Sequence, residues 1–319
     1  MKTVIAGGSG QVGQLLARAF QKDGHDVVIL SRQRNAQKVG RIVLWDARML
    51  GDWCAEFEGA DVVINLTGKS VNCRYTAKNR REIIRSRVDS TAVVGQAIRR
   101  ARRPPRVWLQ AATATIYAHR YDAAHDEFSG VLARDDDDVP DTWRFSLDVA
   151  TKWESAFNQS GELPPTRKVL LRCAVIMSPD RGGIFDVLLG LVRRGLGGQS
   201  GDGRQYVSWI HDADFIRAIY WLIEHEQLEG VVILASPRPL PNVEFMRALR
   251  EAWGTRVGLP ATKWMLEVAT FFMRTETELV LKSRRVVPGR LLRDGFEFEF
   301  PNWKDAARDL CQRWRRTKV

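Results

Sequence analysis

The chain has 319 residues, of which 45% are hydrophobic and 27% charged, and its formal net charge is +11. This composition is typical of a globular protein and excludes extensive disorder and fibrous or collagen-like structure. No apolar run reaches the roughly 18 residues that a membrane-spanning helix needs, and glycines follow Met1 too closely for a signal-peptide core. We therefore expect a cytoplasmic protein with one large domain, or with one large and one small domain.

The basic composition also suggests nucleic-acid binding as one alternative. Arginines gather at 80–87 and 99–106, in segments of helical character and without any nucleic-acid-binding motif. Solvated helix faces and a general attraction for anions are the favoured interpretation. The 4 cysteines and 5 histidines lack paired or metal-ligand spacing, so we expect neither a disulfide framework nor a metal site.

Strand and helix patterns alternate through the first two thirds of the chain. Short β-rich runs predict strands at 3–6, 27–30, 41–45, 62–66, 107–111, 168–176 and 230–235. Apolar residues at helical spacing predict helices at 11–22, 77–100 and 143–157. This alternation is typical of right-handed β-α-β units and predicts an α/β fold with a Rossmann-type, doubly wound parallel sheet.

The last third has a different character. It contains a predicted helix at 242–253, helical patterns from Pro260 to about Leu281, and a final helix from about Trp303. We interpret it as a small mixed C-terminal substrate lobe at the carboxyl edge of the sheet, where open α/β sheets bind ligands. The predicted domains are a Rossmann-type domain over 1–240, with substrate-lobe insertions after about 177, and a small domain over 241–319.

The first predicted strand ends in a glycine loop that leads directly into a helix. Gly7, Gly10 and Gly13 have the spacing G-x-x-G-x-x-G. Such glycines allow a tight turn and let backbone N–H groups approach a pyrophosphate, which the dipole of the following helix also favours. Because strand, loop and helix occur together at the start of a β-α-β unit, the loop predicts dinucleotide binding rather than a structural turn.

The end of the second strand indicates which nicotinamide cofactor is bound. An acidic residue there would accept a hydrogen bond from the ribose 2′-hydroxyl, but this strand ends in Ser31 and Arg32. A guanidinium beside a hydroxyl suits a 2′-phosphate instead. The sequence therefore favours NADP(H) over NAD(H), with a solvated loop arginine as the alternative.

Further motifs occur in order along the chain: Asn65-Leu66-Thr67-Gly68, Ser86-Arg87, Thr151-Lys152-Trp153-Glu154, Gly195-Leu196-Gly197-Gly198, Ser208-Trp209-Ile210-His211, Arg285-Val286-Val287-Pro288 and Gly295-Phe296. Together with the glycine loop, they resemble an atypical group of extended short-chain dehydrogenase/reductases. These are epimerase-family proteins, similar to nucleoside-diphosphate-sugar epimerases, with a C-terminal domain of unknown function. The resemblance covers essentially the whole chain.

The resemblance implies NADP(H) bound across the strand ends. It implies that Ser9, Gly10, Gln11 and Val12 contact the pyrophosphate and that Ser31 and Arg32 face the 2′-phosphate. Leu66 and Thr67 would line the adenosine-ribose side, and Glu82, Arg87 and Val175 fall at dinucleotide-contacting positions. Glu82 is equally well explained as an ordinary helix-surface carboxylate.

Active short-chain dehydrogenases carry a Tyr-x-x-x-Lys pair on one helix face, in which the tyrosine is the acid/base and the lysine lowers its pKa. Aligning Glu154 with the glutamate that often follows the pair puts Ser146 and Ala150 at its positions, and the frame one residue earlier gives Phe145 and Val149. Neither frame supplies the acid or the cation. Apolar residues recur here at four-residue steps, which predicts a core-facing stripe.

Other residues are candidates for the missing chemistry. Thr113 matches the substrate-orienting hydroxyl, and Tyr117 follows it by four residues as a candidate acid/base, although a packed aromatic is the favoured interpretation of Tyr117. Asp148 and Lys152 could form an exposed ion pair as readily as a proton relay. For His211 a structural hydrogen bond is favoured over acid/base work. Arg74 and Tyr75 could meet an anionic substrate or lie on the surface.

Three functions are compatible with the sequence. The first is an NADP(H)-dependent oxidoreductase or epimerase, monomeric or homodimeric, acting on a small polar substrate, anionic substrates included. The second is a non-catalytic regulator that senses NADPH, a hypothesis motivated by the missing Tyr/Lys pair. Nucleic-acid binding through the arginine clusters is the least favoured of the three.

Overall fold

The computed structural model describes the chain except for residues 35–38, 134–138, 262–280 and 317–319. Its centre is a seven-stranded sheet in the order β10-β6-β5-β4-β1-β2-β3, in which every neighbouring pair is parallel. The strands are β1 (Lys2–Ala6), β2 (Asp26–Ser31), β3 (Arg41–Leu44), β4 (Val62–Asn65), β5 (Val107–Thr113), β6 (Arg167–Cys173) and β10 (Gly230–Leu234). This arrangement confirms the predicted Rossmann-type α/β fold.

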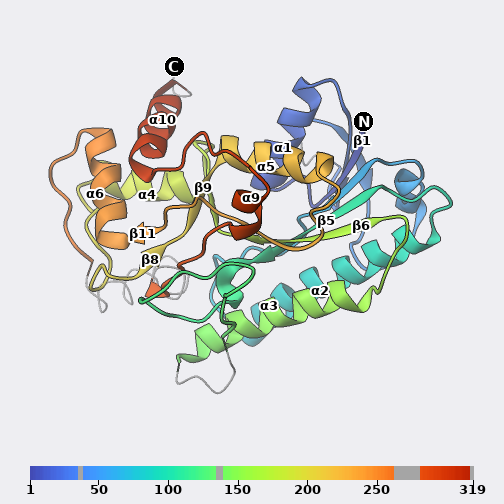
Figure 1. Cartoon of the computed structure of the whole chain (residues 1–319), viewed down its shortest axis with the longest axis horizontal. Helices are drawn as coiled ribbons and strands as arrows, with labels where there is room; N and C mark the ends of the chain where they lie inside the picture. Colours follow the sequence, from blue (N-terminus) through green and yellow to red (C-terminus); the bar gives the residue numbers. More distant parts are fainter. Residues whose placement is uncertain (35–38, 134–138, 262–280, 317–319) are drawn as a thin grey trace.

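Helices cover both faces of the sheet. Helices α1 (Gln11–Lys22) and α5 (Asp212–Glu224) lie on one face, while α2 (Ala77–Arg100), α3 (Asp141–Gln159) and the 3₁₀ helix η1 (Asp52–Phe57) lie on the other (Figure 1). Successive strand residues point to opposite faces, so Ile5 packs with α1 and α5 and Val4 packs with α2. Both residues are fully buried, which explains the continuous apolar runs in the sequence.

A second core lies beyond the carboxyl edge of the sheet. It joins α4 (Ile184–Arg193), α6 (Asn242–Trp253) and α10 (Trp303–Arg316) with the short strands β7 (Val175–Met177), β8 (Tyr206–Val207), β9 (Trp209–His211) and β11 (Leu240–Pro241). At its centre Phe245 stacks on Trp303 with ring centroids 4.0 Å apart, and Trp209 meets the same indole edge-on. The second lobe is therefore built both from residues that precede β10 in the sequence and from residues that follow it. The short helix α9 (Gly289–Arg293) packs against β10 itself.

Most predicted element bounds lie within two residues of those in the structure, and α1, α2 and α6 match at both ends. The strand predicted at 168–176 is wrong as one element, because β6 ends at Cys173 and β7 pairs with β9 in a separate sheet. The neighbouring strand β10 ends at Leu234, opposite Cys173, so the chain beyond finds its hydrogen-bond partner on β9. The helical patterns predicted from Pro260 to Leu281 lie almost wholly outside the described residues. No helix within the described ranges is long and apolar enough to cross a membrane.

Candidate functional site

The glycine loop between β1 and α1 is a tight turn held by backbone contacts. Gly7 has a φ of 74° and donates its N–H to the Leu30 carbonyl at 3.1 Å. A Cβ on Gly7 would lie 2.9 Å from the backbone of Thr67, and one on Gly13 would lie 2.4 Å from the Cα of Gly8. Side chains at these two positions would push strand and helix apart, so glycine is required at both.

The loop presents the amino end of α1 as a place for an anion. The first helical hydrogen bond is donated by Gln14 N–H to the Gly10 carbonyl, and no side chain caps the helix. The N–H groups of Gln11, Val12 and Gly13 precede that bond and so have no partner within the helix. The positive end of the helix dipole adds to them, and this combination binds phosphate groups in many proteins.

A segment from the second lobe closes against this loop. Gly183, just before α4, lies so near that a Cβ there would be 2.0 Å from the side-chain Nε2 of Gln11. Asp180 on the same segment forms an ion pair with Arg18 of α1. The segment before α4, distant in the sequence, therefore covers the glycine loop and the start of α1.

At the end of β2, Ser31 is buried and Arg32 is exposed. The Ser31 hydroxyl accepts a hydrogen bond from Gln33 N–H at 3.1 Å and lies 3.5 Å from the Ser9 hydroxyl, which joins the strand end to the glycine loop. The pKa of Glu82 on α2 is lowered, first by a hydrogen bond from Lys69 and further by the charges of Lys78 and Arg32. Arg32 and Glu82 therefore belong to one cluster, and cations outnumber carboxylates in it.

Thr67, after β4, faces the loop from the other side. Its N–H donates to Asn65 Oδ1 at 3.0 Å, while its hydroxyl oxygen is buried with no hydrogen-bond partner in the described part of the chain. Leu66 is half-buried beside it and donates its N–H to the Ala6 carbonyl. A buried, unpartnered hydroxyl is costly and is an appropriate contact for an incoming polar ligand.

Arg87 and Val175 complete the set of predicted cofactor contacts. The Arg87 guanidinium donates to the carbonyl oxygens of Lys69 at 3.0 Å and Ile83 at 3.1 Å and lies 4.9 Å from the centre of the Trp153 ring. Burial lowers its pKa to about 10. Val175 is half-buried at the start of β7 and donates its N–H to the Ser208 carbonyl.

Helix α3 carries no acid/base pair on its inner face. The stripe that includes Phe145, Val149, Trp153 and Phe157 is buried throughout. Next to it Glu154 accepts two hydrogen bonds of 2.8 Å from the guanidinium of Arg172 on β6, and both side chains are about nine-tenths buried. In place of a Tyr/Lys pair the inner face of α3 thus holds packed apolar residues and one buried, bidentate ion pair.

The hydroxyl of Tyr117 belongs to the same buried network. It accepts a hydrogen bond from Arg172 Nη1 at 2.9 Å, and its ring stacks on His125 at 5.1 Å and is 3% exposed. Burial raises the pKa of Tyr117, although the Arg172 charge opposes this effect. The packed aromatic role, favoured from the sequence, fits this geometry better than acid/base work. Thr113 at the end of β5 is half-buried, with its hydroxyl 3.1 Å from that of Thr115.

The remaining candidate residues make packing, hydrogen-bond or ion-pair contacts within the fold. His211 is fully buried, accepts the Ala213 N–H at the start of α5 and bonds Asp309 of α10 at 3.0 Å, and burial lowers its pKa. Asp148 and Lys152 form an exposed ion pair of 2.7 Å. Tyr75 is buried against Phe145 rather than lying on the surface.

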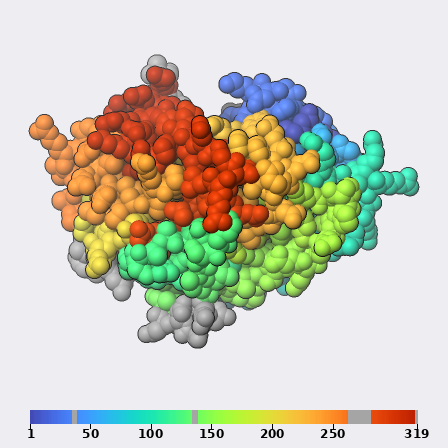
Figure 2. Space-filling view, viewed as in Figure 1, coloured from blue at the N-terminus to red at the C-terminus, as the bar shows by residue number. Residues whose placement is uncertain are grey.

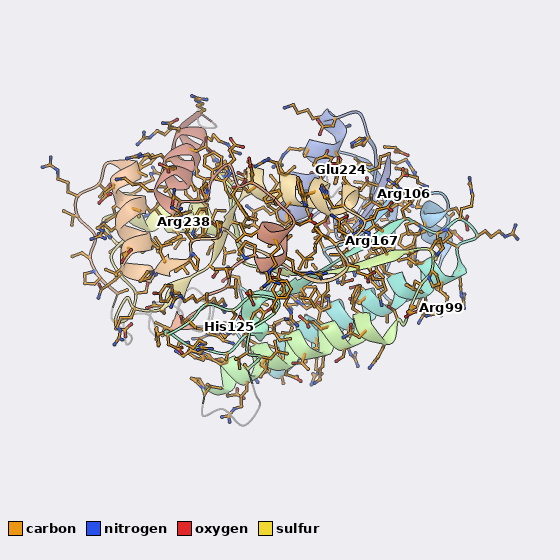
Figure 3. All side chains as sticks on the ribbon, in the orientation of Figure 1. Arg99, Arg106, His125, Arg167, Glu224 and Arg238 are labelled. Atoms are coloured by element: carbon orange, nitrogen blue, oxygen red, sulfur yellow. The ribbon has the colours of Figure 1, made fainter. Side chains whose placement is uncertain are left out.

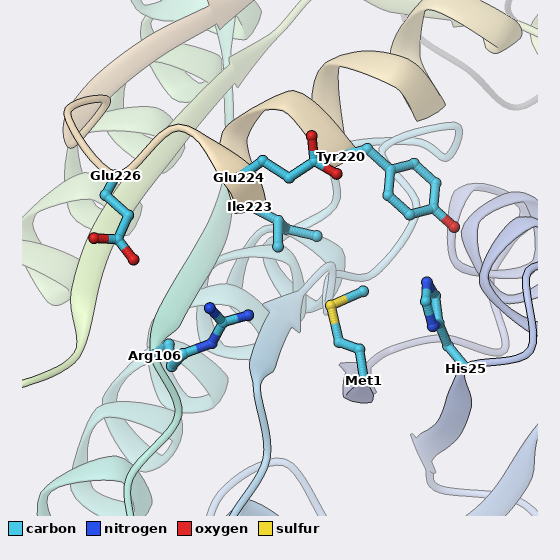
Figure 4. A pocket seen from close by; sticks show the side chains of 7 residues that line it. All are labelled: Met1, His25, Arg106, Tyr220, Ile223, Glu224 and Glu226. Carbon is cyan, nitrogen blue, oxygen red and sulfur yellow. The ribbon is translucent and has the colours of Figure 1, made fainter.

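Two hollows open at the opposite, amino edge of the sheet. The larger has a volume of about 990 Å³ and includes Arg167 and Lys168, and the smaller, of about 250 Å³, lies between Met1 and Tyr220 (Figures 3 and 4). Arg167 donates to carbonyl oxygens at and beyond the end of α5, and Lys168 to those at the end of α3. Both cations thus hold helix ends in place, and ligands of such sheets bind at the carboxyl edge, so neither hollow is our candidate site.

Comparison with known proteins places this architecture in a family. The family model described as "NAD dependent epimerase/dehydratase family" matches residues 3–234. The chain belongs to this family. A second model, "Domain of unknown function (DUF1731)", matches residues 261–310 of this epimerase-family chain, which include α9 and the first part of α10. The predicted family resemblance is therefore confirmed.

Relatives of this epimerase-family protein are similar over nearly their whole length. "Epimerase family protein SDR39U1" of Mus musculus is 30% identical over 97% of this chain and 99% of its own. "Epimerase family protein SERP0438" of Staphylococcus epidermidis is 29% identical over 97% and 98%. The crystal structure of human SDR39U1 with NADPH has a TM-score of 0.83 at 27% identity, covering 98% and 99% of the two chains. A UDP-N-acetylglucosamine 4-epimerase from Bacillus cereus, at 16% identity and TM-score 0.75 over 99% of both chains, shares the fold.

Some residues near the site were not found from the sequence. Lys69 binds Glu82, and Arg172 holds both Glu154 and Tyr117, yet no motif marks either cation. Glu154 itself was marked by the Thr151-Lys152-Trp153-Glu154 motif and by its alignment with the glutamate that follows the usual pair. The partner of Glu154 is Arg172 on β6, a strand that follows α3 in the sequence. The sequence pattern does not show that this strand packs against the helix.

Proposed function

We propose that this chain binds NADP(H) at the carboxyl edge of its sheet. In this proposal the pyrophosphate contacts Ser9, Gly10, Gln11 and Val12. Gly7 approaches Thr67 so closely that a side chain does not fit there, and the ligand meets the backbone of the loop instead. The unpartnered Thr67 hydroxyl and the half-buried Leu66 line the ribose side. Glu82, Arg87 and Val175 complete the cofactor contacts. The tight, uncapped glycine loop is the observation that carries this proposal.

The preference for the phosphorylated cofactor rests on Arg32. This exposed guanidinium follows the buried Ser31 at the end of β2. An NAD(H) site would need a carboxylate at this strand end to accept a hydrogen bond from the ribose 2′-hydroxyl. The neighbouring Lys69 and Lys78 add positive charge around Glu82. That the structure of human SDR39U1 was determined with NADPH also supports this choice.

The reaction that fits this arrangement is an oxidation, reduction or epimerisation of a small polar substrate, in which NADP(H) supplies or accepts a hydride. The Thr113 hydroxyl orients the substrate from the end of β5, next to the strand end that holds Thr67. Tyr117 is the candidate acid/base, and the hydrogen bond that its hydroxyl accepts from Arg172 would stabilise the phenolate form. We propose a cytoplasmic monomer or homodimer.

Titration of the purified protein with NADPH, NADP⁺, NADH and NAD⁺, followed by calorimetry, tests the cofactor assignment. We expect tight binding of NADPH that depends on the 2′-phosphate and weakens in Arg32→Ala. Absence of binding to all four nucleotides would contradict the proposal. The substrate screen is then run on the NADPH complex, with Thr113→Val as the variant expected to lose turnover.

A non-catalytic regulator that senses NADPH is the second candidate. It is favoured by the apolar packing of Phe145 and Val149 at the positions of one frame for the missing pair. On this hypothesis NADPH changes which proteins the chain binds, without being consumed. Affinity capture of binding partners with and without NADPH distinguishes the regulator from the enzyme. Partners that do not change with NADPH, together with turnover of any carbonyl compound, support the enzyme.

A further inference from the structure

The segment before α4 connects the second lobe with the glycine loop. Residues 180–183, which we call the strap, lie between β7 and α4. Arg18 of α1 forms an ion pair with Asp180, and the side chain of Gln11 lies against the backbone of Gly183. Figure 2 shows the blue start of the chain and the orange and red parts of the second lobe on different sides of the view. The strap therefore joins two parts of the molecule that are otherwise distant in sequence.

The second lobe fixes the strap as a defined turn. Gly182 N–H donates to Asp186 Oδ2 at 3.0 Å, and Asp186 Oδ1 accepts a hydrogen bond from the Trp314 indole of α10 at 2.8 Å. Asp180 N–H donates to the hydroxyl of the buried Ser178 at 3.3 Å. These contacts hold the strap in the second lobe, and its contacts with α1 are additional to them.

The strap meets α1 next to the free amino end of this helix. Gln11 is the first helical residue, no side chain caps the helix, and the N–H groups at its start have no partner within it. Gly183 touches the Gln11 side chain, while Asp180 meets Arg18 about two turns further along. An anion bound at these N–H groups would therefore have the glycine loop on one side and the strap beside it.

We propose that the strap forms the outer wall of the nucleotide site, and that Asp180 is a positioning residue that holds this wall over the pyrophosphate through its ion pair with Arg18. This inference rests on the proposed function, because it adds the second lobe to the same cofactor site. A ligand enclosed between two elements leaves only after they separate, so a contact between them slows its release. The two side chains are 46% and 34% exposed, so the pair should change the release rate by a few-fold and not block release.

The sign of one charge change separates this role from simple electrostatics. Asp180 adds a negative charge to the strap, beside the place proposed for a pyrophosphate, which is itself an anion. Without a holding role, Asp180→Asn would remove repulsion and free the Arg18 charge, so NADPH would leave more slowly or at the same rate. With the holding role, the same change loosens the wall and NADPH leaves faster.

The test measures release of NADPH from the saturated protein by stopped flow, with excess NADP⁺ as competitor and nicotinamide fluorescence as the signal. We expect Asp180→Asn to speed release by about two- to fivefold, with a melting temperature close to that of the parent. The charge-swapped variant Arg18→Asp/Asp180→Arg should recover most of the parent rate. The control Asp305→Asn removes an exposed carboxylate 3.5 Å from Arg308 on α10 and should leave the rate unchanged.

A smaller ligand shows whether the effect belongs to the pyrophosphate. The nucleotide 2′-AMP carries the 2′-phosphate that Arg32 is proposed to bind, and it has no pyrophosphate. Its affinity, measured by calorimetry, should agree within about twofold between the parent and Asp180→Asn, because an exposed pair far from its contacts contributes little. Equal losses of affinity for 2′-AMP and NADPH would overturn the inference, since Asp180 would then act on the whole fold.

Hydrogen exchange tests closure of the strap without measuring release. NADPH should slow amide exchange of residues 180–187 in the parent, because enclosed backbone opens less often. The slowing should be smaller in Gly183→Ala, whose added Cβ would displace the Gln11 side chain. Exchange that NADPH leaves unchanged in the parent would show that the strap does not close on the nucleotide, and the inference would be wrong.

The outcomes separate this inference from the proposed function. If the parent binds NADPH and Asp180→Asn releases it at the same rate or more slowly, the strap has no holding role and the cofactor proposal stands. If the parent binds no nicotinamide nucleotide, the cofactor proposal fails and the inference about the strap fails with it.

Discussion

The glycine loop and helix α3 are the two parts of this fold that would hold a dinucleotide and move a proton, and they differ in what they retain. In the loop, Gly7 and Gly13 still allow contacts that any Cβ would prevent. On α3, the corresponding inner face is filled by Phe145, Val149 and Trp153. The proposed cofactor half of the site keeps its tight glycine turn, whereas the helix face that would carry the usual Tyr/Lys pair is packed core.

The difference teaches that the two halves depend on different kinds of residue. A backbone site needs the absence of side chains, and the positive φ of Gly7 and its closeness to Thr67 make that requirement strict. A helix face tolerates a change from Tyr/Lys to apolar residues, because burial of the new side chains stabilises the same packing. Chemistry can then move to other residues around the same strand ends.

Breaking the ion pair of α3 is the largest expected perturbation. Glu154→Ala leaves the Arg172 guanidinium buried without its bidentate partner and should destabilise the protein by about 3–5 kcal/mol, measured by urea unfolding. The double variant Glu154→Leu/Arg172→Leu should recover most of the loss. NADPH affinity should stay within about threefold where the variant is folded, and a much larger drop would show that α3 still serves the cofactor.

A methyl group in the glycine loop should have the next largest effect. Gly7→Ala places a Cβ 2.9 Å from the Thr67 backbone at a φ of 74°, so the loop has to move. We expect NADPH affinity to fall by about 30–100-fold, or about 2–3 kcal/mol.

Gly24→Ala is the matched control, with a φ of 75° and no atom within 4 Å of the added Cβ. It should cost roughly 1–2 kcal/mol of stability through backbone strain and leave NADPH affinity unchanged. Equal NADPH binding by both variants would contradict the role of the loop.

Arg32→Ala tests the choice of cofactor at the end of β2. Loss of a charge-assisted contact with the 2′-phosphate should weaken NADPH by about 1.5–3 kcal/mol and leave NADH binding nearly unchanged. Arg34→Ala, two residues away and also exposed, is the control. A parallel loss for NADPH and NADH would show that Arg32 acts on the fold rather than on the phosphate.

The smallest effect is expected on the outer face of α3. Lys152→Met removes an exposed ion pair with Asp148 and should change stability by no more than about 0.5 kcal/mol. NADPH binding and any turnover should be unaffected. A large loss of turnover without a change in melting temperature would instead favour the proton relay and reopen α3 as a catalytic helix.

Local sequence patterns were sufficient for much of the fold. The helix at 242–253 has the predicted bounds because Gly254, with a φ of 88°, ends it, and the glycine loop is recognisable from the regular spacing of Gly7, Gly10 and Gly13. The division of the 168–176 run into β6 and β7 could not be predicted, since it depends on where β10 ends. No sequence signal near residues 168–176 indicates where β10 ends.

The sequence by itself determined the α/β sheet, the family, the glycine loop and the lack of a Tyr/Lys pair, because each is written in short runs of residues. The tertiary structure alone decided which side chains meet at the strand ends. Tyr117 and Arg172 are 55 residues apart, and Thr115 and Lys282 are 167 residues apart. Such contacts follow from the order of strands and the docking of the second lobe, which no local spacing records.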